Sequence, residues 1–355
     1  MSVFLSRERR RLAPYAPGEQ PRGEKLIKLN TNEAPYSPPQ SVLDAVSAAA
    51  GGLNLYPDPE GAELRAALAV YHGVSPRNIS LGNGSDETLA FAFAAFGGAE
   101  AAFAFPDITY GFYPSPAALY GVPYTEIPVD ASLKIRAEDY VGIGKNIVLA
   151  NPNSPTGEVL PMADIERVAE SNPGRAVIID EAYADFWGSS AAPLTKRFEN
   201  LLVVRTYSKS RFLAGARLGY AVGDEGLIGD IETVRYSFNP YNLNSMTLAA
   251  GIGALKEETY YKERWREIAE TRDETQEALR ELGFVTTRSM ANFVFARHES
   301  VPGAELMACL RERGVLTRSL GRERARPWLR VTVGTPEQMK TFVGAAADAI
   351  KTYCS

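Results

Sequence analysis

The sequence holds few of the residues that build disulfides and metal sites, with two cysteines and two histidines among 355 residues. Two cysteines in so long a chain give no disulfide framework, which predicts a reducing, cytoplasmic setting. The histidines, His72 and His298, lie far apart in the sequence, so carboxylates would have to supply nearly all the ligands of a zinc site. We therefore expect no metal.

Long apolar runs and an excess of positive charge are missing as well. No segment approaches the roughly 18 uncharged apolar residues that span a membrane, and the N-terminus has no apolar stretch after a basic one. We expect neither a membrane span nor a secretory signal. The formal net charge of −5 argues against a general nucleic-acid binder, which usually presents a basic face.

The composition is that of an ordinary globular protein, 45% hydrophobic and 23% charged, and the length is sufficient for two domains. From residue 40 to about 245, helical patterns alternate with short apolar runs. The helical patterns lie near 40–50, 61–72, 85–97 and 161–171, and the strand-like runs at 103–105, 147–150, 176–180, 201–205 and 218–223. This alternation predicts an α/β fold, in which helices cover both faces of a mostly parallel sheet in three layers.

After residue 245 the pattern changes. A long helical pattern ends at Gly283, and short strands, a helix near 303–314 and a final helix from Pro336 follow it. These elements predict a smaller α+β unit that packs with the Pro- and Asn-rich arm at 20–40. We therefore expect a large domain, 40–245, and a small domain made of 1–39 and 246–355.

Small and polar residues follow the predicted strands. The segments are "GNGSDE" (82–87), "NPNSPTG" (151–157), "DEAY" (180–183) and "TYSKS" (206–210). Because the ligands of such sheets gather beyond the carboxyl ends of the strands, we expect these segments to form one site.

Each segment also has an ordinary interpretation. Ser85 and Asp86 at a helix start can hold a phosphate through backbone N–H groups, or can simply form an N-cap. Lys209 near other cations would have a lowered pKa and act as a nucleophile, whereas most lysines are solvated. Asp180 at the end of a buried run needs a cationic partner, and Arg217 could bind a phosphate or form an ion pair. Together these residues predict pyridoxal phosphate, which carries an aldehyde, a ring nitrogen and a phosphate.

The residues at 208–219, "SKSRFLAGARLG", match the pattern S-K-x-x-x-L-A-G-x-R-x-G, and in this pattern the chain resembles the fold-type I pyridoxal-phosphate aminotransferases. Further segments resemble the histidinol-phosphate aminotransferases within that group. They are "LNTNEAPYSP" (29–38), "YPDP" (56–59), "GNGSDE" (82–87), "PDITYGFY" (106–113) and "LRVTVGT" (329–335). The resemblance extends from about Leu12 to the C-terminus.

The resemblance implies how the matching residues would hold pyridoxal phosphate. Lys209 would form the Schiff base and act as acid and base, Asp180 would pair with the pyridinium nitrogen, and Tyr183 would hydrogen-bond the phenolic oxygen. Tyr110 would stack on the ring. The phosphate would be held by Ser85, Asp86, Thr206, Ser208 and Arg217, and by Tyr56 of a neighbouring subunit, which implies a homodimer.

Other matching residues would bind the substrate. Arg330 would take the carboxylate of glutamate in one half-reaction and the substrate phosphate in the other, and Arg318 and Tyr15 would assist at the phosphate. Asn32 belongs to the same substrate-binding group. The stretch "LGRERARP" (320–327) supplies further arginines, in what we expect to be a solvated loop.

Two positions depart from the family pattern. Ser154 stands where relatives have an asparagine that contacts the phenolic oxygen of the cofactor. Either Asn153 or a water takes over that contact, or the contact is weaker. Arg211 stands where many relatives have a smaller or aromatic residue, and we expect a surface ion pair there.

The implied function is a ping-pong transfer of the amino group between L-histidinol phosphate and 2-oxoglutarate, a step of histidine biosynthesis. An aromatic or broad-specificity aminotransferase and a phosphothreonine decarboxylase share the cofactor motifs and stay open as alternatives. Other classes fit less well. "GIGKN" (142–146) lacks the glycine spacing and the Ser/Thr of a phosphate loop, no G-x-G-x-x-G follows a strand, and Lys209 argues against a catalytically silent binding protein.

Overall fold

The computed structural model describes residues 2–22 and 25–354. Its largest element is a seven-stranded sheet with the strand order β2-β8-β7-β6-β5-β3-β4. These strands are β2 (Ile79–Gly82), β3 (Phe103–Pro106), β4 (Tyr124–Ile127), β5 (Asn146–Ala150), β6 (Val177–Asp180), β7 (Leu201–Thr206) and β8 (Gly219–Gly223). The run from β7 to β4 is parallel, and β8 is antiparallel to both of its neighbours, so the predicted mostly parallel sheet is confirmed.

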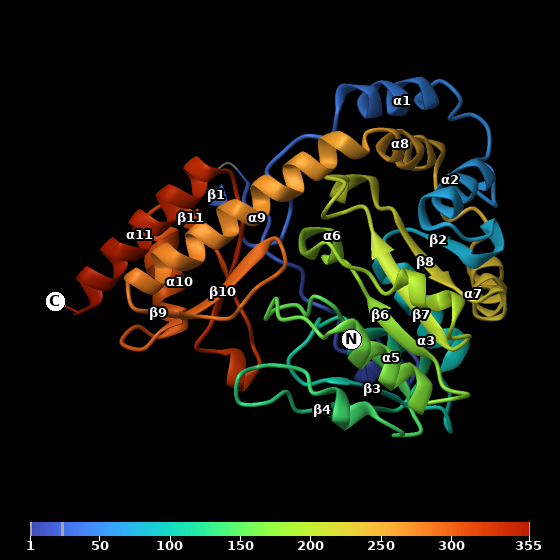
Figure 1. The fold of residues 1–355 in the computed structure, drawn as a ribbon, viewed down its shortest axis with the longest axis horizontal. Coiled ribbons are helices and arrows are strands. Elements are labelled where there is room, and N and C mark those ends of the chain that lie inside the picture. The colour runs from blue at the N-terminus through green and yellow to red at the C-terminus, as the bar shows by residue number, and fades with distance from the viewer. Residues whose placement is uncertain (1, 23–24, 355) are drawn as a thin grey trace.

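Helices cover both faces of this sheet, because the residues of its central strands alternate between two apolar clusters. Ile178 of β6 packs in the cluster that contains Phe93 of α3 (Ser85–Phe96) and Ile231 of α7 (Glu225–Phe238). The next residue, Ile179, packs in the cluster that contains Ile165 of α5 (Met162–Ser171). Figure 1 shows the resulting layers. The short helices α4 (Pro114–Tyr120) and α6 (Ala184–Trp187) complete this unit.

The long helical pattern that follows residue 245 is two helices, α8 (Ser245–Lys256) and α9 (Glu258–Glu281). Helix α8 packs against α1 (Gln40–Ala50) and α2 (Ala62–His72), so it lies with the large sheet although the predicted boundary at 245 assigns it to the small domain. Helix α9 then runs from α8 across to the second sheet (Figure 1).

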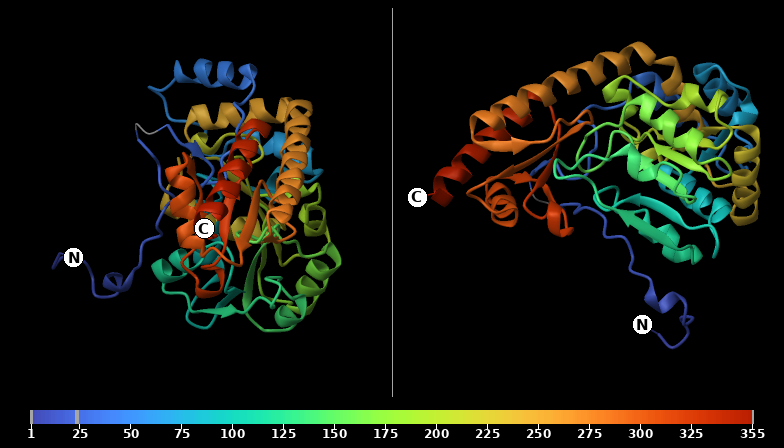
Figure 2. Two further views of the ribbon diagram at one scale, coloured as in Figure 1. Left: turned by 90° about the vertical axis from the view of Figure 1, so that its left-hand side faces the viewer. Right: turned by 60° about the horizontal axis from the view of Figure 1, so that its bottom comes forward.

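The second sheet has the antiparallel strand order β12-β13-β10-β9. Its strands are β9 (Phe284–Thr286), β10 (Phe293–His298), β12 (Arg318–Ser319) and β13 (Leu329–Thr332), and α9, α10 (Gly303–Glu312) and α11 (Pro336–Cys354) lie beside it. Figure 2 shows the two units side by side. The N-terminal arm joins the second unit, because β1 (Ile27–Lys28) pairs with β11 (Val315–Leu316).

The segment at 320–327 is mostly exposed, as expected from its composition, and two of its arginines also anchor it to the large unit. Arg322 donates hydrogen bonds to both carboxylate oxygens of Glu126. Arg324 donates to Asp107 and to the backbone oxygens of Val129 and Asp130. Arg322 and Arg324 therefore connect the two units. No helix in the described part of the chain is long and apolar enough to cross a membrane.

Candidate active site

A cavity of about 410 Å³ lies where the parallel strands of the large sheet end. Ala150 of β5 pairs with Asp180 of β6, and Asp180 pairs with Val204 of β7, so the three strands end at nearly the same level. The loops that follow them form one wall of the cavity, and residues of the N-terminal arm and of β12 and β13 form the other. The site therefore lies between the two units.

The structure brings together nearly all the residues predicted for the site. The cavity is lined by Tyr15, Asn32, Ser85, Asp86, Tyr110, Ser154, Asp180, Tyr183, Thr206, Ser208, Lys209, Arg217, Arg318 and Arg330. Two predicted residues, Tyr56 and Asn153, do not line it. Tyr56 is 81% exposed and stacks on Tyr241 with ring centres 4.6 Å apart.

Asn153 does not line the cavity because its side-chain amide forms hydrogen bonds with neighbouring residues instead. Its Nδ2 donates to the backbone oxygen of Ile108 and to Thr156, and its Oδ1 accepts a hydrogen bond from Thr109. Ser154, by contrast, lines the cavity and accepts a hydrogen bond from Nη1 of Arg330 at 3.2 Å. Asn153, which was predicted to take over the contact of the usual asparagine, therefore does not face the cavity, whereas Ser154 does.

One end of the cavity has the form of an anion site. Helix α3 begins there at Ser85, after Gly84, whose φ of 85° favours glycine. The first N–H groups of a helix have no partner within the helix, and they attract a negative charge. Arg217 approaches this turn so closely that a Cβ on Gly84 would lie 2.5 Å from Nη2 of the guanidinium.

The hydroxyls of Thr206 and Ser208 lie beside the same anion site. They hydrogen-bond each other at 3.0 Å, and Ser208 accepts a second hydrogen bond from Nη1 of Arg217 at 3.4 Å. The carboxylate of Asp86 is engaged elsewhere, because Tyr110 donates to it at 2.9 Å and Arg217 lies 3.7 Å away. Asp86 would therefore act on an anion through its backbone N–H.

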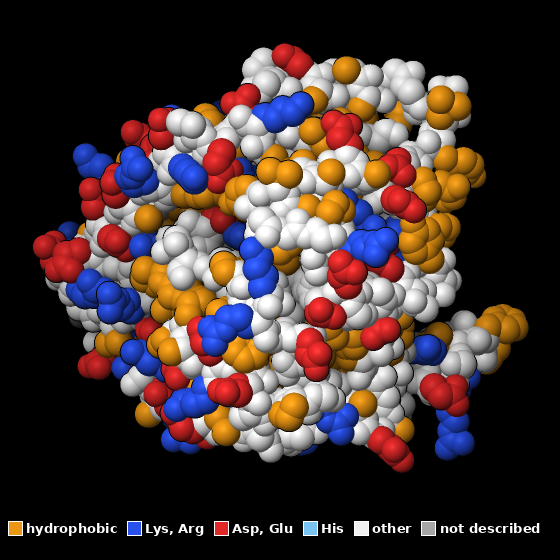
Figure 3. Space-filling model, turned by 45° about the vertical axis from the view of Figure 1, so that its right-hand side comes forward, with side chains coloured by type: hydrophobic (Ala, Val, Ile, Leu, Met, Phe, Trp, Pro, Cys, Tyr) orange, Lys and Arg blue, Asp and Glu red, His pale blue; other side chains and the backbone are white. Residues whose placement is uncertain are grey.

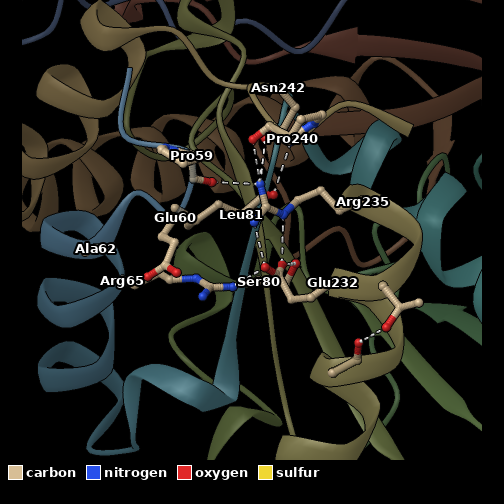
Figure 4. Close-up of polar contacts among 12 residues, drawn as sticks. Pro59, Glu60, Ala62, Arg65, Ser80, Leu81, Glu232, Arg235, Pro240 and Asn242 are labelled. Atoms are coloured by element: carbon tan, nitrogen blue, oxygen red, sulfur yellow. Dashed lines mark hydrogen bonds and ion pairs between the residues drawn. The ribbon is translucent and has the colours of Figure 1, made fainter. Parts of the chain in front are cut away.

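A buried polar network supports the anion turn from behind. Glu87 accepts hydrogen bonds from the backbone N–H of Asn83 and from Nδ2 of Asn242. Arg235, which is 2% exposed, holds Asn242 and donates to the backbone oxygens of Pro59 and Pro240. Glu232, from the same helix, pairs with Arg235 and with Arg65 of α2 (Figure 4). The anion turn is therefore tied to two surface segments, 58–60 and 240–242.

Lys209 lies at the centre of the cavity, with Nζ 3.1 Å from the backbone oxygen of Thr31. Burial, together with the positive charges of Arg330 and Arg217, lowers the pKa of Lys209 to about 8 from the usual 10.5, although Glu33 and Asp86 act in the opposite direction. A substantial fraction of this amine is therefore neutral and nucleophilic near neutral pH.

Asp180 is a carboxylate whose two hydrogen-bond donors are both neutral. Burial raises its pKa to about 6, against hydrogen bonds from the hydroxyl of Tyr113 at 2.9 Å and from the backbone N–H of Ala182. A cation placed beside it would stabilise the ionised form. Tyr113 was not predicted as a site residue, although it ends the quoted segment "PDITYGFY". The contact of Tyr113 with Asp180 could not be inferred from the sequence, because the sequence does not show that α4 begins directly after Tyr113.

Tyr183, in the loop after β6, meets residues of the opposite wall that are predicted to bind the substrate. The hydroxyl of Tyr183 accepts a hydrogen bond from Nδ2 of Asn32 at 2.9 Å, and Asn32 is held by Thr332 of β13. Arg330 is 9% exposed, donates from Nη1 to Ser154 and from Nη2 to the backbone oxygen of Asn30, and has no partner for its buried Nε. An unpaired buried donor beside a cavity favours an anionic ligand.

A second cavity of about 240 Å³ adjoins the first and shares Tyr15, Tyr110, Ser154, Arg318 and Arg330 with it. Its remaining wall includes Leu320 and Ala325, from the segment that connects the two units. The two cavities together could hold a ligand larger than the cofactor alone.

The prediction for Arg211 is wrong in one respect. It does form an ion pair, with Glu258 at 2.6 Å, but it is 4% exposed and lies beneath the loop of Lys209 instead of on the surface. The sequence alone predicts a surface position for this arginine, because it does not show that α9 begins beside it.

The family model for aminotransferase class I and II matches residues 24–345, and the chain belongs to that family. Among relatives, it is 46% identical to histidinol-phosphate aminotransferase 1 of Bradyrhizobium diazoefficiens, over 99% of this chain and 100% of the relative. It is 45% identical to histidinol-phosphate aminotransferase of Aromatoleum aromaticum, over 99% and 100%. A solved structure of histidinol-phosphate aminotransferase from Sinorhizobium meliloti, in complex with pyridoxal-5'-phosphate, is similar with a TM-score of 0.85 and 26% identity, over 93% and 92% of the two chains.

The residues of the cavity fit pyridoxal phosphate. The helix start at Ser85 and the fork of Arg217 fit its phosphate, the buried Asp180 lacks the cation that a pyridinium nitrogen supplies, and Lys209 is an amine suited to an aldehyde. The turn that would hold the phosphate is also closely packed. A Cβ on Gly219 would lie 2.4 Å from the backbone of Gly84 and of Ser85.

Gly219→Ala is expected to weaken cofactor binding about tenfold or more. The added methyl group must displace the backbone of the anion turn, and such overpacking typically costs about 1–3 kcal/mol. Equilibrium dialysis against pyridoxal phosphate measures the affinity, and the melting temperature checks the fold. Gly229→Ala is the control, because a Cβ there meets no atom within 4 Å. Equal affinities of the two variants would contradict the close packing of the turn.

The lowered pKa of Lys209 predicts a distinct pH profile in the cofactor-free protein. Only the neutral amine reacts with trinitrobenzenesulfonate, so modification of Lys209 should rise with pH around a midpoint near 8. Lys262, whose side chain is 62% exposed, is the solvated control for the reaction. Peptide mapping by mass spectrometry follows both residues. Coincident profiles would show that Lys209 is solvated.

Proposed function

We propose that this chain is a homodimeric, cytoplasmic aminotransferase that transfers the amino group of L-histidinol phosphate to 2-oxoglutarate, a step of histidine biosynthesis. The observation that carries the proposal is the pair Arg318 and Arg330, which lie with Lys209 in one cavity. A phosphorylated amine needs more cations than a simple amino acid does. The full-length similarity to proteins named histidinol-phosphate aminotransferase supports the same donor.

Bound pyridoxal phosphate supplies an aldehyde that combines with amines and a ring that stabilises negative charge at the carbon next to the nitrogen. Lys209 would be the amine that holds this aldehyde, and its free Nζ would accept the proton from Cα of the donor. Asp180 keeps the ring nitrogen protonated, because a buried carboxylate without another cation strongly favours a positive partner. The hydroxyl of Tyr183, fixed by Asn32, would hydrogen-bond the phenolic oxygen.

Arg330 would bind the anionic group of the substrate in both half-reactions. Its free Nε and its position on β13 allow it to hold either the phosphate of the donor or a carboxylate of the acceptor. Arg318, on the neighbouring β12, adds a second positive charge on the same side. The second cavity, with Tyr15 and Leu320 in its wall, would hold the rest of the donor.

The donor is tested by the rate of glutamate formation from 2-oxoglutarate with histidinol phosphate, phenylalanine or phosphothreonine. We expect kcat/KM for histidinol phosphate to exceed that for phenylalanine at least about tenfold, since a paired charge contributes roughly 1.5–3 kcal/mol. Lys209→Ala is the control for the site and should lose about 10²–10⁴-fold in kcat. A preference for phenylalanine would make this an aromatic aminotransferase, and carbon dioxide release from phosphothreonine would indicate a decarboxylase.

The homodimer is supported by apolar side chains that are exposed near Tyr56. Leu53 is 56% exposed, Leu55 69% and Phe238 69%, and Figure 3 shows apolar side chains along the edge of this face. The N-terminal segment also extends away from the body of the subunit, with Phe4 93% exposed (Figure 2). A partner subunit would cover such surfaces.

Tyr56→Phe tests both the dimer and the reach of Tyr56 into the partner's site. Loss of a hydroxyl that bonds a phosphate should weaken pyridoxal phosphate binding about tenfold, although Tyr56 lies outside the cavity of its own subunit. Tyr241→Phe, in its stacking partner, is the control and should bind normally. Light scattering should give twice the mass of the chain. A monomeric mass, or unchanged affinity in Tyr56→Phe, would contradict this arrangement.

A further inference from the structure

Arg211 is held on several sides although it follows Lys209 by only two residues. The centre of its guanidinium lies 5.0 Å from the ring centre of Trp265, 5.1 Å from Tyr261 and 5.5 Å from Tyr71. Its Nη1 lies 2.6 Å from the carboxylate of Glu258. Three of these partners belong to the first turns of α9, so the cation fixes the loop to the helix that runs across to the second unit.

The residue between Lys209 and Arg211 is fixed to the same helix. The backbone oxygen of Ser210 accepts a hydrogen bond from Nε1 of Trp265 at 2.6 Å. Its hydroxyl donates to Asp185, which also pairs with Arg205 of β7. Ser210 is therefore anchored to α9 through its backbone oxygen and to Arg205 of the sheet through Asp185.

The backbone after Arg211 is strained. Phe212 has a φ of 56°, in the left-handed region that bulky residues rarely adopt. The turn brings the backbone N–H of Leu213 within 3.1 Å of the oxygen of Tyr207 and thereby closes the loop that contains Lys209. Such a conformation persists only where the surroundings determine it. The rings that surround Arg211 provide those surroundings, because Tyr261 also packs on the ring of Phe212, at 5.3 Å.

We propose that Arg211 is a positioning residue for Lys209: its clamp on α9 holds the strained loop in the shape that presents Nζ to the reacting carbon. The proposal rests on the proposed role of Lys209 as proton acceptor, but not on the identity of the amine donor. The residues that would bind the substrate anion, Arg318 and Arg330, lie on β12 and β13 and not on this loop. Loss of the clamp therefore slows proton transfer and leaves substrate affinity nearly unchanged.

The test compares wild-type holoenzyme with Arg211→Met, which keeps an unbranched apolar side chain but removes the charge and the planar fork. Steady-state rates are measured with the donor protonated or deuterated at Cα. We expect kcat to fall about tenfold, KM to stay within about twofold, and the deuterium isotope effect on kcat to increase as proton transfer becomes slower. Arg211→Lys retains the ion pair and should recover part of the rate.

Arg264→Met is the matched control. Arg264 lies on the same helix, is stacked at 5.0 Å on Tyr36 and at 5.6 Å on Tyr260, and pairs with Glu267. We expect its isotope effect to equal that of the wild type even if its melting temperature falls. An unchanged isotope effect in Arg211→Met, or the same increase in both variants, would overturn the proposal.

Trp265→Phe covers the case in which Arg211→Met does not fold. It keeps a ring beside Arg211 but removes the hydrogen bond to Ser210, and we expect a smaller increase of the isotope effect. An unchanged isotope effect in a folded Trp265→Phe would also overturn the proposal. If the wild-type enzyme does not convert histidinol phosphate, only the proposed donor is contradicted. The isotope effects of the variants are then compared with the amine that the wild type does convert.

Discussion

The parallel register of β5, β6 and β7 is the constraint on which the site depends. Parallel strands that end at the same level place their last residues, and the loops that follow, at a single edge of the sheet. The backbone of these loops no longer forms hydrogen bonds of the sheet. Asp180 ends β6 and Thr206 ends β7, so a carboxylate and a hydroxyl both line the cavity at this edge. The reversed strand β8 begins at this edge and brings Arg217 to it.

Charge is then distributed so that the cavity favours an anionic, ring-shaped ligand. Lys209 and Arg330 both line the cavity, and the positive charge of Arg330 lowers the pKa of Lys209. Burial also lowers the pKa of Arg330. Asp180, at the end of β6, carries the opposite charge, and its two hydrogen-bond donors are neutral groups. These buried charges are unfavourable without a ligand. A bound phosphate would neutralise part of the positive charge, and a protonated ring nitrogen would neutralise the negative charge of Asp180.

The sequence sufficed for the fold where burial and local pattern agree. The strands at 147–150, 176–180 and 201–205 were predicted because β5, β6 and β7 are buried over their whole length. Strand β4 was not predicted, since it lies at the edge of the sheet and half of its residues are exposed. Helix α7 was also missed, and α8 and α9 were read as one helix because Glu257 interrupts them without a glycine or proline.

The site shows the same division. Motif residues such as Lys209 and Asp180 could be placed from strand ends, because their position depends on local sequence and on the direction of one sheet. The surroundings of Arg211 could not, since they combine α2, α9 and a loop that are far apart in the chain. Asn153 and Ser154 are neighbours in sequence, and only the backbone path decides which of them faces the cavity.

The contact between Asn32 and Thr332 joins residues 300 positions apart. A ribosome completes the large sheet long before it reaches β13, so a growing chain can acquire the anion turn and Lys209 while Arg330 does not yet exist. The arm that carries Asn32 cannot form its contact with Thr332 until almost the whole polypeptide has emerged. The residues proposed to hold the cofactor and those proposed to bind the substrate are thus separated in the order of synthesis, as they are separated in space between the two units.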